Sequence, residues 1–177
     1  MNVFIAIDVN DNFKNLKIAV DRIDKQIGIN KSKLPLHISL MMPFEIEDEM
    51  LDNLISDVNT FFKERDVFNI YPKGIENVHT ICWLRMKESK IINDMHDDLL
   101  KMIVDKYHIK PHEYDYDYKF HCTLFLNEDA NIIDKGYELI KNEMYPEVVN
   151  AKNICLGISD SGLIGTYHIY HKFELRS

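Results

Sequence analysis

The alternation of apolar and polar positions along the chain predicts a mixture of helices and strands. Apolar residues recur at helical spacing in segments that we expect to be helices at about 11–27, 48–63, 88–107 and 131–143. Apolar runs elsewhere predict strands at about 3–9, 34–42, 67–76, 79–86, 119–126, 147–159 and 166–175. Pro43 should end the second of these strands, and the polar, aromatic stretch 108–118 should be a loop.

This order of elements indicates an α+β fold. Several strands follow one another through short turns, so the sheet should be antiparallel in large part. In each half of the chain, a strand that contains a histidine is followed by a helix and then by a pair of strands. We therefore expect two similar lobes within one domain that spans residues 1–177.

Two predicted strands share a short pattern, in which a histidine is followed two residues later by a hydroxyl residue. The pattern is His37-Ile38-Ser39 in one strand and His121-Cys122-Thr123 in the other. The chain has eight histidines, and chance would give less than one such match. Residues i and i+2 of a strand point to the same side, so each histidine shares a face with its hydroxyl partner.

The residues around the two patterns place both pairs away from the helices. One face of each strand is apolar and should pack beneath helices: Leu34, Leu36, Ile38, Leu40 and Met42 in the first, and Tyr118, Phe120, Cys122, Leu124 and Leu126 in the second. The opposite faces carry Pro35, His37, Ser39 and Met41, and Lys119, His121, Thr123 and Phe125. We expect the two histidine–hydroxyl pairs to meet on this second face, where Lys119 would add positive charge.

These side chains suit acid–base chemistry on a phosphate ester. A neutral imidazole accepts a proton from water or a hydroxyl, and an imidazolium donates one to a leaving oxygen. His37 and His121 are the candidate catalytic pair, and the hydroxyls of Ser39 and Thr123 would hold the non-bridging phosphate oxygens. This chemistry calls for no metal and no cofactor. A zinc site on the two histidines is an alternative, although no HExxH segment or CxxC pair would complete it.

Composition restricts the partners. The formal net charge of −8 argues against binding of long duplex nucleic acid, which favours basic proteins. It still allows binding of a small nucleotide or an RNA end. No segment has the pattern of a signal peptide or a membrane span, so we expect a cytoplasmic protein without membrane contact, acting as a monomer. The three separated cysteines should be reduced core thiols: Cys82, Cys122 and Cys155.

Other residues are weaker candidates for the site. Phe4 could line its floor, and Tyr167 and His171 would share a face of the last strand, where they could contact a base or a phosphate. Arg85 and Lys152 could lie at its rim. A cluster of tyrosines before the second pattern could cover a base or could be an ordinary loop: Tyr114, Tyr116 and Tyr118. The histidines without a partner pattern should be surface residues: His79, His96, His108, His112 and His168.

At these residues the chain resembles the 2H phosphoesterase superfamily, and most of all its 2′,5′ RNA ligase-like and bacterial YjcG-like branches. The resemblance rests on two H-x-[S/T]-x motifs 84 residues apart and covers nearly the whole chain. It extends to FIAIDVNDNF at 4–13, LPLHISLMMPFEI at 34–46 and KFHCTLFLN at 119–127. The closing pattern resembles the family's last strand: Gly165, Tyr167, Ile169, Phe173 and Leu175.

The resemblance implies a bilobal α+β fold with pseudo-two-fold symmetry. Two antiparallel-rich sheets would form a central cleft, with the helices on the outside. The implied activity is metal-independent cleavage of a 2′,3′-cyclic or 2′,5′-type phosphodiester in a nucleotide or an RNA end, with His37 and His121 as the acid–base pair. Two alternatives remain: ligation of 2′,5′ RNA in the same cleft, and a non-catalytic nucleotide-binding or regulatory module.

Overall fold

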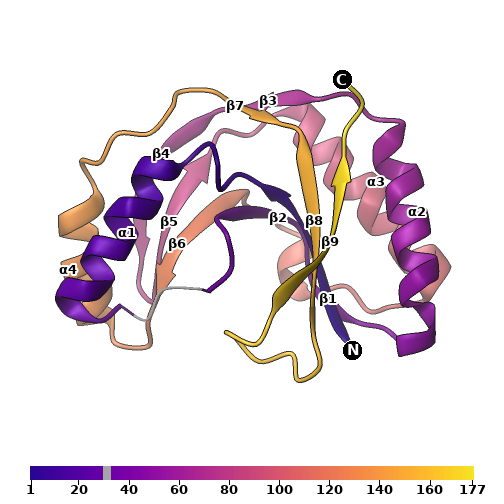
Figure 1. The fold of residues 1–177 in the computed structure, drawn as a ribbon, viewed down its shortest axis with the longest axis horizontal. Helices are drawn as coiled ribbons and strands as arrows, with labels where there is room; N and C mark the ends of the chain where they lie inside the picture. The colour runs from indigo at the N-terminus through magenta and orange to yellow at the C-terminus, as the bar shows by residue number, and fades with distance from the viewer. Residues whose placement is uncertain (30–32) are drawn as a thin grey trace.

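The computed structural model describes residues 1–29 and 33–177, and its centre is an arched antiparallel sheet (Figure 1). The α+β class expected from the sequence is confirmed, and each expected helix is present. The helices are α1 (Lys14–Ile27), α2 (Leu51–Lys63), α3 (Lys90–Tyr107) and α4 (Ala130–Ile140), with single turns η1 (Asp48–Met50) and η2 (Glu113–Asp115). The strands are β1 (Asn2–Asp8), β2 (His37–Glu45), β3 (Phe68–Ile70), β4 (Pro72–Val78), β5 (Ile81–Met86), β6 (His121–Leu126), β7 (Val149–Ala151), β8 (Asn153–Ser159) and β9 (His168–Glu174).

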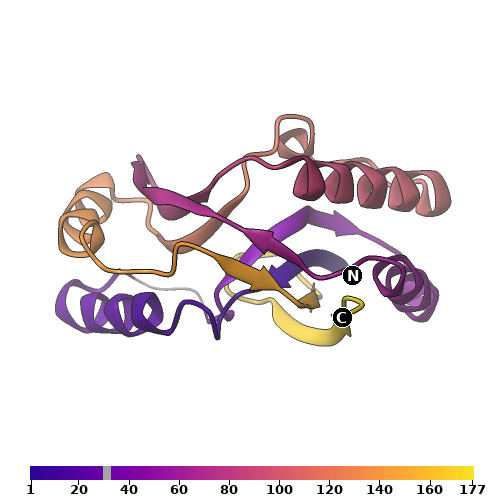
Figure 2. The ribbon, with the colours of Figure 1, turned by 90° about the horizontal axis from the view of Figure 1, so that it is seen from above.

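The sheet has the order β4-β5-β6-β2-β1-β8-β9, and every neighbouring pair in it is antiparallel. Instead of two separate sheets, the two halves are continuous, and they join where Ile38 of β2 pairs with Cys122 of β6. Helices α1 and α4 pack on the β4-β5-β6 half, whereas α2 and α3 pack on β9 and β2. Figures 1 and 2 show these two pairs of helices at opposite ends of the molecule.

Two strands expected to be continuous are each divided in two. The segment 67–76 separates into β3 and β4, and the segment 147–159 separates into β7 and β8. The short first parts, β3 and β7, pair with each other as a two-stranded ribbon. The equivalent division in both halves supports the expected internal similarity.

Proline does not end β2, contrary to the expectation for Pro43. The strand continues to Glu45, which pairs with Asn2 of β1. The register shifts between the pairs Ile5–Met41 and Val3–Phe44, so Pro43 lies in an irregular stretch of the ladder. A residue without an N–H group is tolerated there because no ladder hydrogen bond is lost.

A bulge follows the histidine–hydroxyl pattern in both motif strands. In β2, Ser39 and Met41 pair with two consecutive residues of β1, so the residue between them has no partner in β1. In β6, Thr123 and Phe125 pair in the same way with two consecutive residues of β5. One extra residue in a bulged strand reverses the facing of the residues after it. Met41 and Phe125 are therefore fully buried on the helix-covered side, and the expectation that they share a face with the histidines is wrong.

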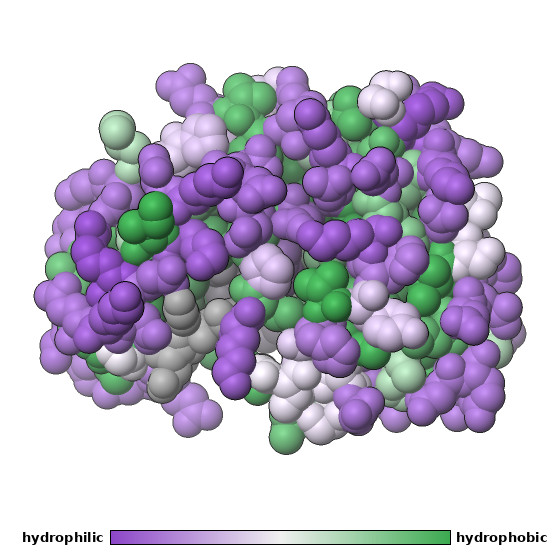
Figure 3. All heavy atoms as spheres, viewed as in Figure 1, coloured by the Kyte–Doolittle hydropathy of each residue, from purple (hydrophilic) through white to green (hydrophobic). Residues whose placement is uncertain are grey.

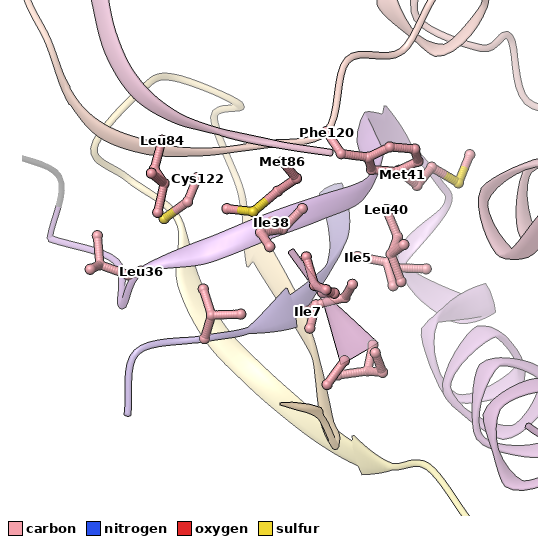
Figure 4. Close-up of a cluster of buried hydrophobic side chains, with 14 of the residues drawn as sticks. Ile5, Ile7, Leu36, Ile38, Leu40, Met41, Leu84, Met86, Phe120 and Cys122 are labelled. Carbon is pink, nitrogen blue, oxygen red and sulfur yellow. The ribbon is translucent and has the colours of Figure 1, made fainter. Parts of the chain in front are cut away.

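The main hydrophobic core lies between the sheet and the helices. Figure 4 shows part of it, which includes Ile7 of β1, Ile38 and Met41 of β2, and Leu84 and Met86 of β5. All three cysteines are buried free thiols, as expected, and burial raises the pKa of each to about 12. Burial of this apolar surface is the main force that holds both halves against one sheet.

Local signals explain the helix boundaries. The Ser89 hydroxyl accepts a hydrogen bond from Ile92 N–H at the start of α3, and the Asp129 carboxylate accepts one from Asn131 N–H at the start of α4. Gly28 ends α1 in a left-handed conformation with φ 68°. On the outside, polar and charged side chains cover most of the face in Figure 3, as a chain with 28% charged residues leads one to expect. Among the described residues, no helix is long and apolar enough to cross a membrane.

Candidate active site

The two motif strands lie side by side in the middle of the sheet, and His37 and His121 stand at their first positions. Because Ile38 pairs with Cys122 in an antiparallel register, each histidine lies beside the hydroxyl residue of the other strand. The resulting neighbours are His37 with Thr123 and His121 with Ser39. The four predicted site residues thus meet around a local two-fold relation, on a side of the sheet that we call the histidine face.

Each imidazole is held in the same way. His37 Nδ1 lies 2.8 Å from the carbonyl oxygen of Pro35, and His121 Nδ1 lies 2.6 Å from that of Lys119. A carbonyl oxygen only accepts, so Nδ1 carries the proton in both rings. Neither Nε2 has a hydrogen-bond partner among the described residues, which leaves these two nitrogens for a substrate.

An aromatic ring flanks each histidine. Phe4 of β1 lies 5.3 Å from the His37 ring, and Tyr167 meets Phe4 edge-on at 5.6 Å. On the other side, Trp83 of β5 lies 4.2 Å from the His121 ring, and its Nε1 donates to Glu76 Oε2 at 2.9 Å. The structure thus places Phe4 and Tyr167 beside the histidines. Trp83 was not among the residues expected from the sequence, although the alternation of Trp83 and Arg85 in β5 was a usable signal.

A smaller hydrophobic cluster confirms that strands and loops, not helices, build the histidine face. Its buried members are Phe4, Ala6 and Cys155, with Leu34, Tyr167 and Ile169 packed against them. None of these residues belongs to a helix.

Burial is the largest influence on both catalytic candidates, and it lowers the pKa of His37 and of His121. At His37, the Pro35 carbonyl and the Asp8 carboxylate oppose this and favour the charged ring. At His121, the Lys119 carbonyl opposes it, whereas the charges of Arg85 and His37 lower the pKa further. The two rings therefore repel each other when both are charged, so their titrations are coupled.

The hydroxyl residues differ in their surroundings. The Thr123 hydroxyl has no hydrogen-bond partner among the described residues. Ser39 lies near Tyr118, whose hydroxyl is buried and has no partner among the described residues. Burial raises the pKa of Tyr118, and the hydroxyl of Ser39 partly opposes that rise. By the strand register, each motif hydroxyl residue lies beside the histidine of the other strand.

His96 is not at the surface, contrary to the expectation from its lack of a partner pattern. It is 3% exposed, and its ring stacks on Tyr118 at 5.1 Å. Its Nδ1 lies 2.7 Å from the carbonyl oxygen of Leu40, and its Nε2 lies 3.0 Å from that of Asp115. His96 therefore ties the bulge of β2 to the segment 112–118, which the sequence pattern could not reveal because the contacts join distant segments.

Three other candidates are placed differently. The Lys119 side chain is exposed, and only its carbonyl group contacts His121, so its role as a positive charge stays a prediction. His171 does not share a face with Tyr167, because a register shift in β9 sets His171 opposite Leu156 and against Phe173 at 4.7 Å. Arg85, by contrast, is buried and pairs with His121 across β5 and β6.

The three tyrosines before the second motif do not lie together. Tyr114 and Tyr116 are exposed, whereas Tyr118 packs between His96 and the site. Across residues 1–29 and 33–177, no group of three or more His, Cys, Asp or Glu side chains is arranged to hold a metal ion.

The fold is shared with solved structures of low sequence identity. TT0787 of Thermus thermophilus superposes with a TM-score of 0.64 at 15% identity, over 99% of this chain and 98% of that one. LigT of E. coli, solved with 3′-AMP, gives a TM-score of 0.60 at 13% identity with the same coverage. Usb1 of Kluyveromyces marxianus gives 0.50 at 14% identity, over 98% of each chain.

Sequence comparison gives the family. No functionally curated protein matches the chain. The model of the 2′-5′ RNA ligase superfamily, however, matches residues 13–163, which include both histidine–hydroxyl motifs. The resemblance seen in the sequence is confirmed: the chain belongs to the 2′-5′ RNA ligase superfamily of 2H phosphoesterases.

Proposed function

We propose that this protein is a metal-independent phosphodiesterase that cleaves a nucleotide or RNA-end phosphodiester between His37 and His121. One observation carries the proposal: both imidazoles donate Nδ1–H to a backbone carbonyl two residues earlier, and neither Nε2 atom on this face has a partner in the described part of the chain. Two such nitrogens are what general acid–base cleavage of a phosphodiester requires.

The reaction divides the work between the rings. One neutral imidazole takes the proton of an attacking water or hydroxyl, and the other ring, protonated, gives its proton to the leaving oxygen. The hydroxyls of Ser39 and Thr123 donate to the non-bridging oxygens, where negative charge develops. Lys119 adds positive charge from the exposed segment before β6. All these groups come from one chain, so we propose that the protein acts as a monomer.

The substrate class is inferred from the charge of the protein and from the aromatic rings of the site. The protein carries a formal charge of −8, which disfavours long nucleic acid. Phe4 with Tyr167 on one side, and Trp83 on the other, supply rings on which a base can stack. Structures of E. coli LigT have been solved with 3′-AMP, NADP+ and ATP. We infer a small nucleotide or a short RNA end with a 2′,3′-cyclic or 2′,5′-linked phosphate.

The test is turnover of a panel of 2′,3′-cyclic nucleotides and of 2′,5′- and 3′,5′-linked dinucleotides in the presence of EDTA. We expect His37→Ala and His121→Ala each to lower kcat/KM by about 10²–10⁴-fold on whichever member is cleaved. His171→Ala is the matched control and should keep the full rate, because His171 lies on the opposite face of β9. Loss of activity with EDTA, or full activity in both variants, would contradict the proposal.

Two other outcomes lead to different functions of the same site. Binding of panel nucleotides without any turnover would indicate a non-catalytic nucleotide-binding or regulatory module. Joining of RNA halves that end in a 2′,3′-cyclic phosphate and a 5′-hydroxyl would show that the ligase direction is the physiological one.

A further inference from the structure

The two halves of the site are related by symmetry, but the charges on their flanks are opposite. His37 pairs with Asp8 of β1 across one side of the motif strands. His121 pairs with Arg85 of β5 across the other side. Directly paired residues of antiparallel strands have neighbouring side chains on the same face. Each histidine therefore has a charged neighbour at the equivalent position, negative for His37 and positive for His121.

Both flanking charges are shielded from water, whereas their own counter-ions are not. The side chains of Asp8 and Arg85 are 13% and 11% exposed, but Lys172 and Glu88, which pair with them, are 61% and 75% exposed. Charges at an exposed position are screened by solvent more strongly than buried ones. The inner charges therefore dominate the potential at the two imidazoles.

The hydrogen bonds of these residues keep each charge in place. One Asp8 oxygen accepts Asn10 N–H at 3.1 Å and the other accepts Lys172 Nζ at 2.9 Å, which fixes the position of the carboxylate. Arg85 approaches Glu88 only to 3.6 Å, and its Nη1 is buried with no acceptor among the described residues. The positive charge beside His121 is thus the less neutralised of the two.

We propose that Asp8 and Arg85 give the two histidines opposite roles: Asp8 keeps His37 protonated as the general acid, and Arg85 keeps His121 neutral as the general base. The proposal rests on the proposed function and adds to it the direction of proton flow. Asp8 and Arg85 are positioning residues, because they act through the histidines and not on the substrate.

The step balances without any further reactant. A water oxygen forms a bond to phosphorus while its proton passes to Nε2 of His121. The bond from phosphorus to the leaving oxygen breaks while Nε2 of His37 transfers its proton to that oxygen. The leaving group then departs on the Phe4 side, and the water enters on the Trp83 side. The opposite signs with which Asp8 and Arg85 act on the pKa of their neighbouring histidines agree with this direction.

The first test varies the leaving group. Two esters of one nucleotide are compared, one that releases a nucleoside and one that releases 4-nitrophenol, which leaves without a proton. His37→Ala should lose about 10²–10⁴-fold on the nucleoside ester but stay within about tenfold of the wild type on the nitrophenyl ester. His121→Ala should lose activity on both. The assignment would be overturned if His121→Ala, and not His37→Ala, kept near wild-type activity on the nitrophenyl ester. Equal losses of activity in both variants on both esters would also overturn it.

The second test needs no turnover, so it separates failure of this proposal from failure of the proposed function. The imidazole NMR signals, assigned with His37→Gln and His121→Gln, are titrated in charge variants. Arg85→Met should raise the pKa of His121 by roughly 0.5–1 unit, and Asp8→Asn should lower that of His37 by a similar amount. Arg85→Lys keeps the positive charge and should leave the pKa of His121 unchanged. This variant therefore separates the effect of the charge from an effect of altered packing.

The exposed counter-ions provide an internal control. Lys172→Met should raise the pKa of His37, opposite to Asp8→Asn, and Glu88→Gln should lower that of His121, opposite to Arg85→Met. The other titratable neighbours are the same in all these charge variants. They are the second histidine, which lies near the first, and Tyr118, which lies beside His121. If Arg85→Met and Asp8→Asn leave both titrations unmoved, the proposal is wrong even for an active enzyme. If the wild type cleaves neither ester but the titrations shift as expected, the proposed function fails and the charge asymmetry stands.

Discussion

At the scale of single residues, the site depends on how two imidazoles are oriented. A hydrogen bond from Nδ1 to the carbonyl of residue i−2 fixes each ring and its tautomer without any other side chain. Burial then lowers the pKa of both rings, since a charged ring loses hydration in the folded protein. The chemistry of the site is therefore set by backbone acceptors and by the charges of Asp8 and Arg85.

These lowered pKa values predict an acidic optimum. The base must be neutral, so kcat/KM rises with pH through its pKa, and the acid must be protonated, so kcat/KM falls as pH passes through the second pKa. The pKa of each histidine lies below the ordinary value of 6.5. We expect a bell-shaped profile of kcat/KM with its maximum below pH 6.5. A maximum above pH 7 in the free enzyme would show that the rings are not desolvated as described.

The free hydroxyl of Thr123 predicts a specific loss. Thr123→Val keeps the shape of the side chain but removes the donor to the phosphate, so kcat/KM should fall by about 10²–10³-fold. Thr123→Ser keeps the donor and should retain most of the activity. The free energy of unfolding, measured in urea, should change little in either variant because no described residue bonds this hydroxyl. An equal loss in both variants would argue for a packing role instead.

At the scale of secondary-structure elements, the bulges and one glycine shape the histidine face. The bulges after Ser39 and Thr123 turn the following residues into the core, so the polar row on the histidine face ends at the hydroxyls. On the β1–β8 side, Gly157 pairs with Phe4, whose ring lies directly over it. The absence of a side chain at Gly157 leaves room for the Phe4 ring beside His37.

Gly157→Ala should therefore damage both stability and activity. A Cβ atom at this position would lie 2.0 Å from the Phe4 ring, which is enclosed by His37 and Tyr167 and has little room to shift. We expect a loss of about 1–3 kcal/mol in the free energy of unfolding, as in other overpacked sites. Gly74→Ala in β4 is the control, since a Cβ there meets nothing within 4 Å. The prediction fails if the two variants have equal urea midpoints.

The buried His96 offers a second prediction at this scale. His96→Phe keeps a ring against Tyr118 but removes both ring nitrogens, so the N–H that donates to the carbonyl oxygen of Leu40 or of Asp115 is lost and a buried acceptor loses its partner in the ring. Each unsatisfied buried group costs about 1–3 kcal/mol, so unfolding in guanidinium should show a clear loss of stability. His168→Phe is the control, because His168 is exposed on β9. A stability change of the same size in both variants would contradict this role.

At the scale of the whole molecule, the negative charge limits what can approach the site. A protein of formal charge −8 gains no general attraction to a phosphate backbone. We expect a fluorescent RNA duplex of about 20 base pairs to show no binding in anisotropy at about 0.15 M salt, whereas a dinucleotide is cleaved. Tight, salt-sensitive binding of the duplex would mean that a basic surface patch dominates over the net charge.

The sequence by itself determined the local part of this protein. Helical periodicity located the four helices, and period-two alternation located the two motif strands with their histidines and hydroxyls on one face, because side-chain direction depends only on neighbouring residues. The same rule went wrong at Met41, Phe125 and His171, where a register shift reversed the alternation. Such shifts depend on the partner strand, which a single segment does not contain.

Only the tertiary structure decided which residues surround the motifs. The positions of Trp83 beside His121, of Asp8 beside His37 and of Arg85 beside His121 come from strand order and register, which long-range packing of the core determines. His96 was expected at the surface because its acceptors, Leu40 and Asp115, lie far away in the sequence. The sequence thus determined the reacting groups, whereas the fold decided the charges that distinguish one from the other, because electrostatic influence follows distance in space and not along the chain.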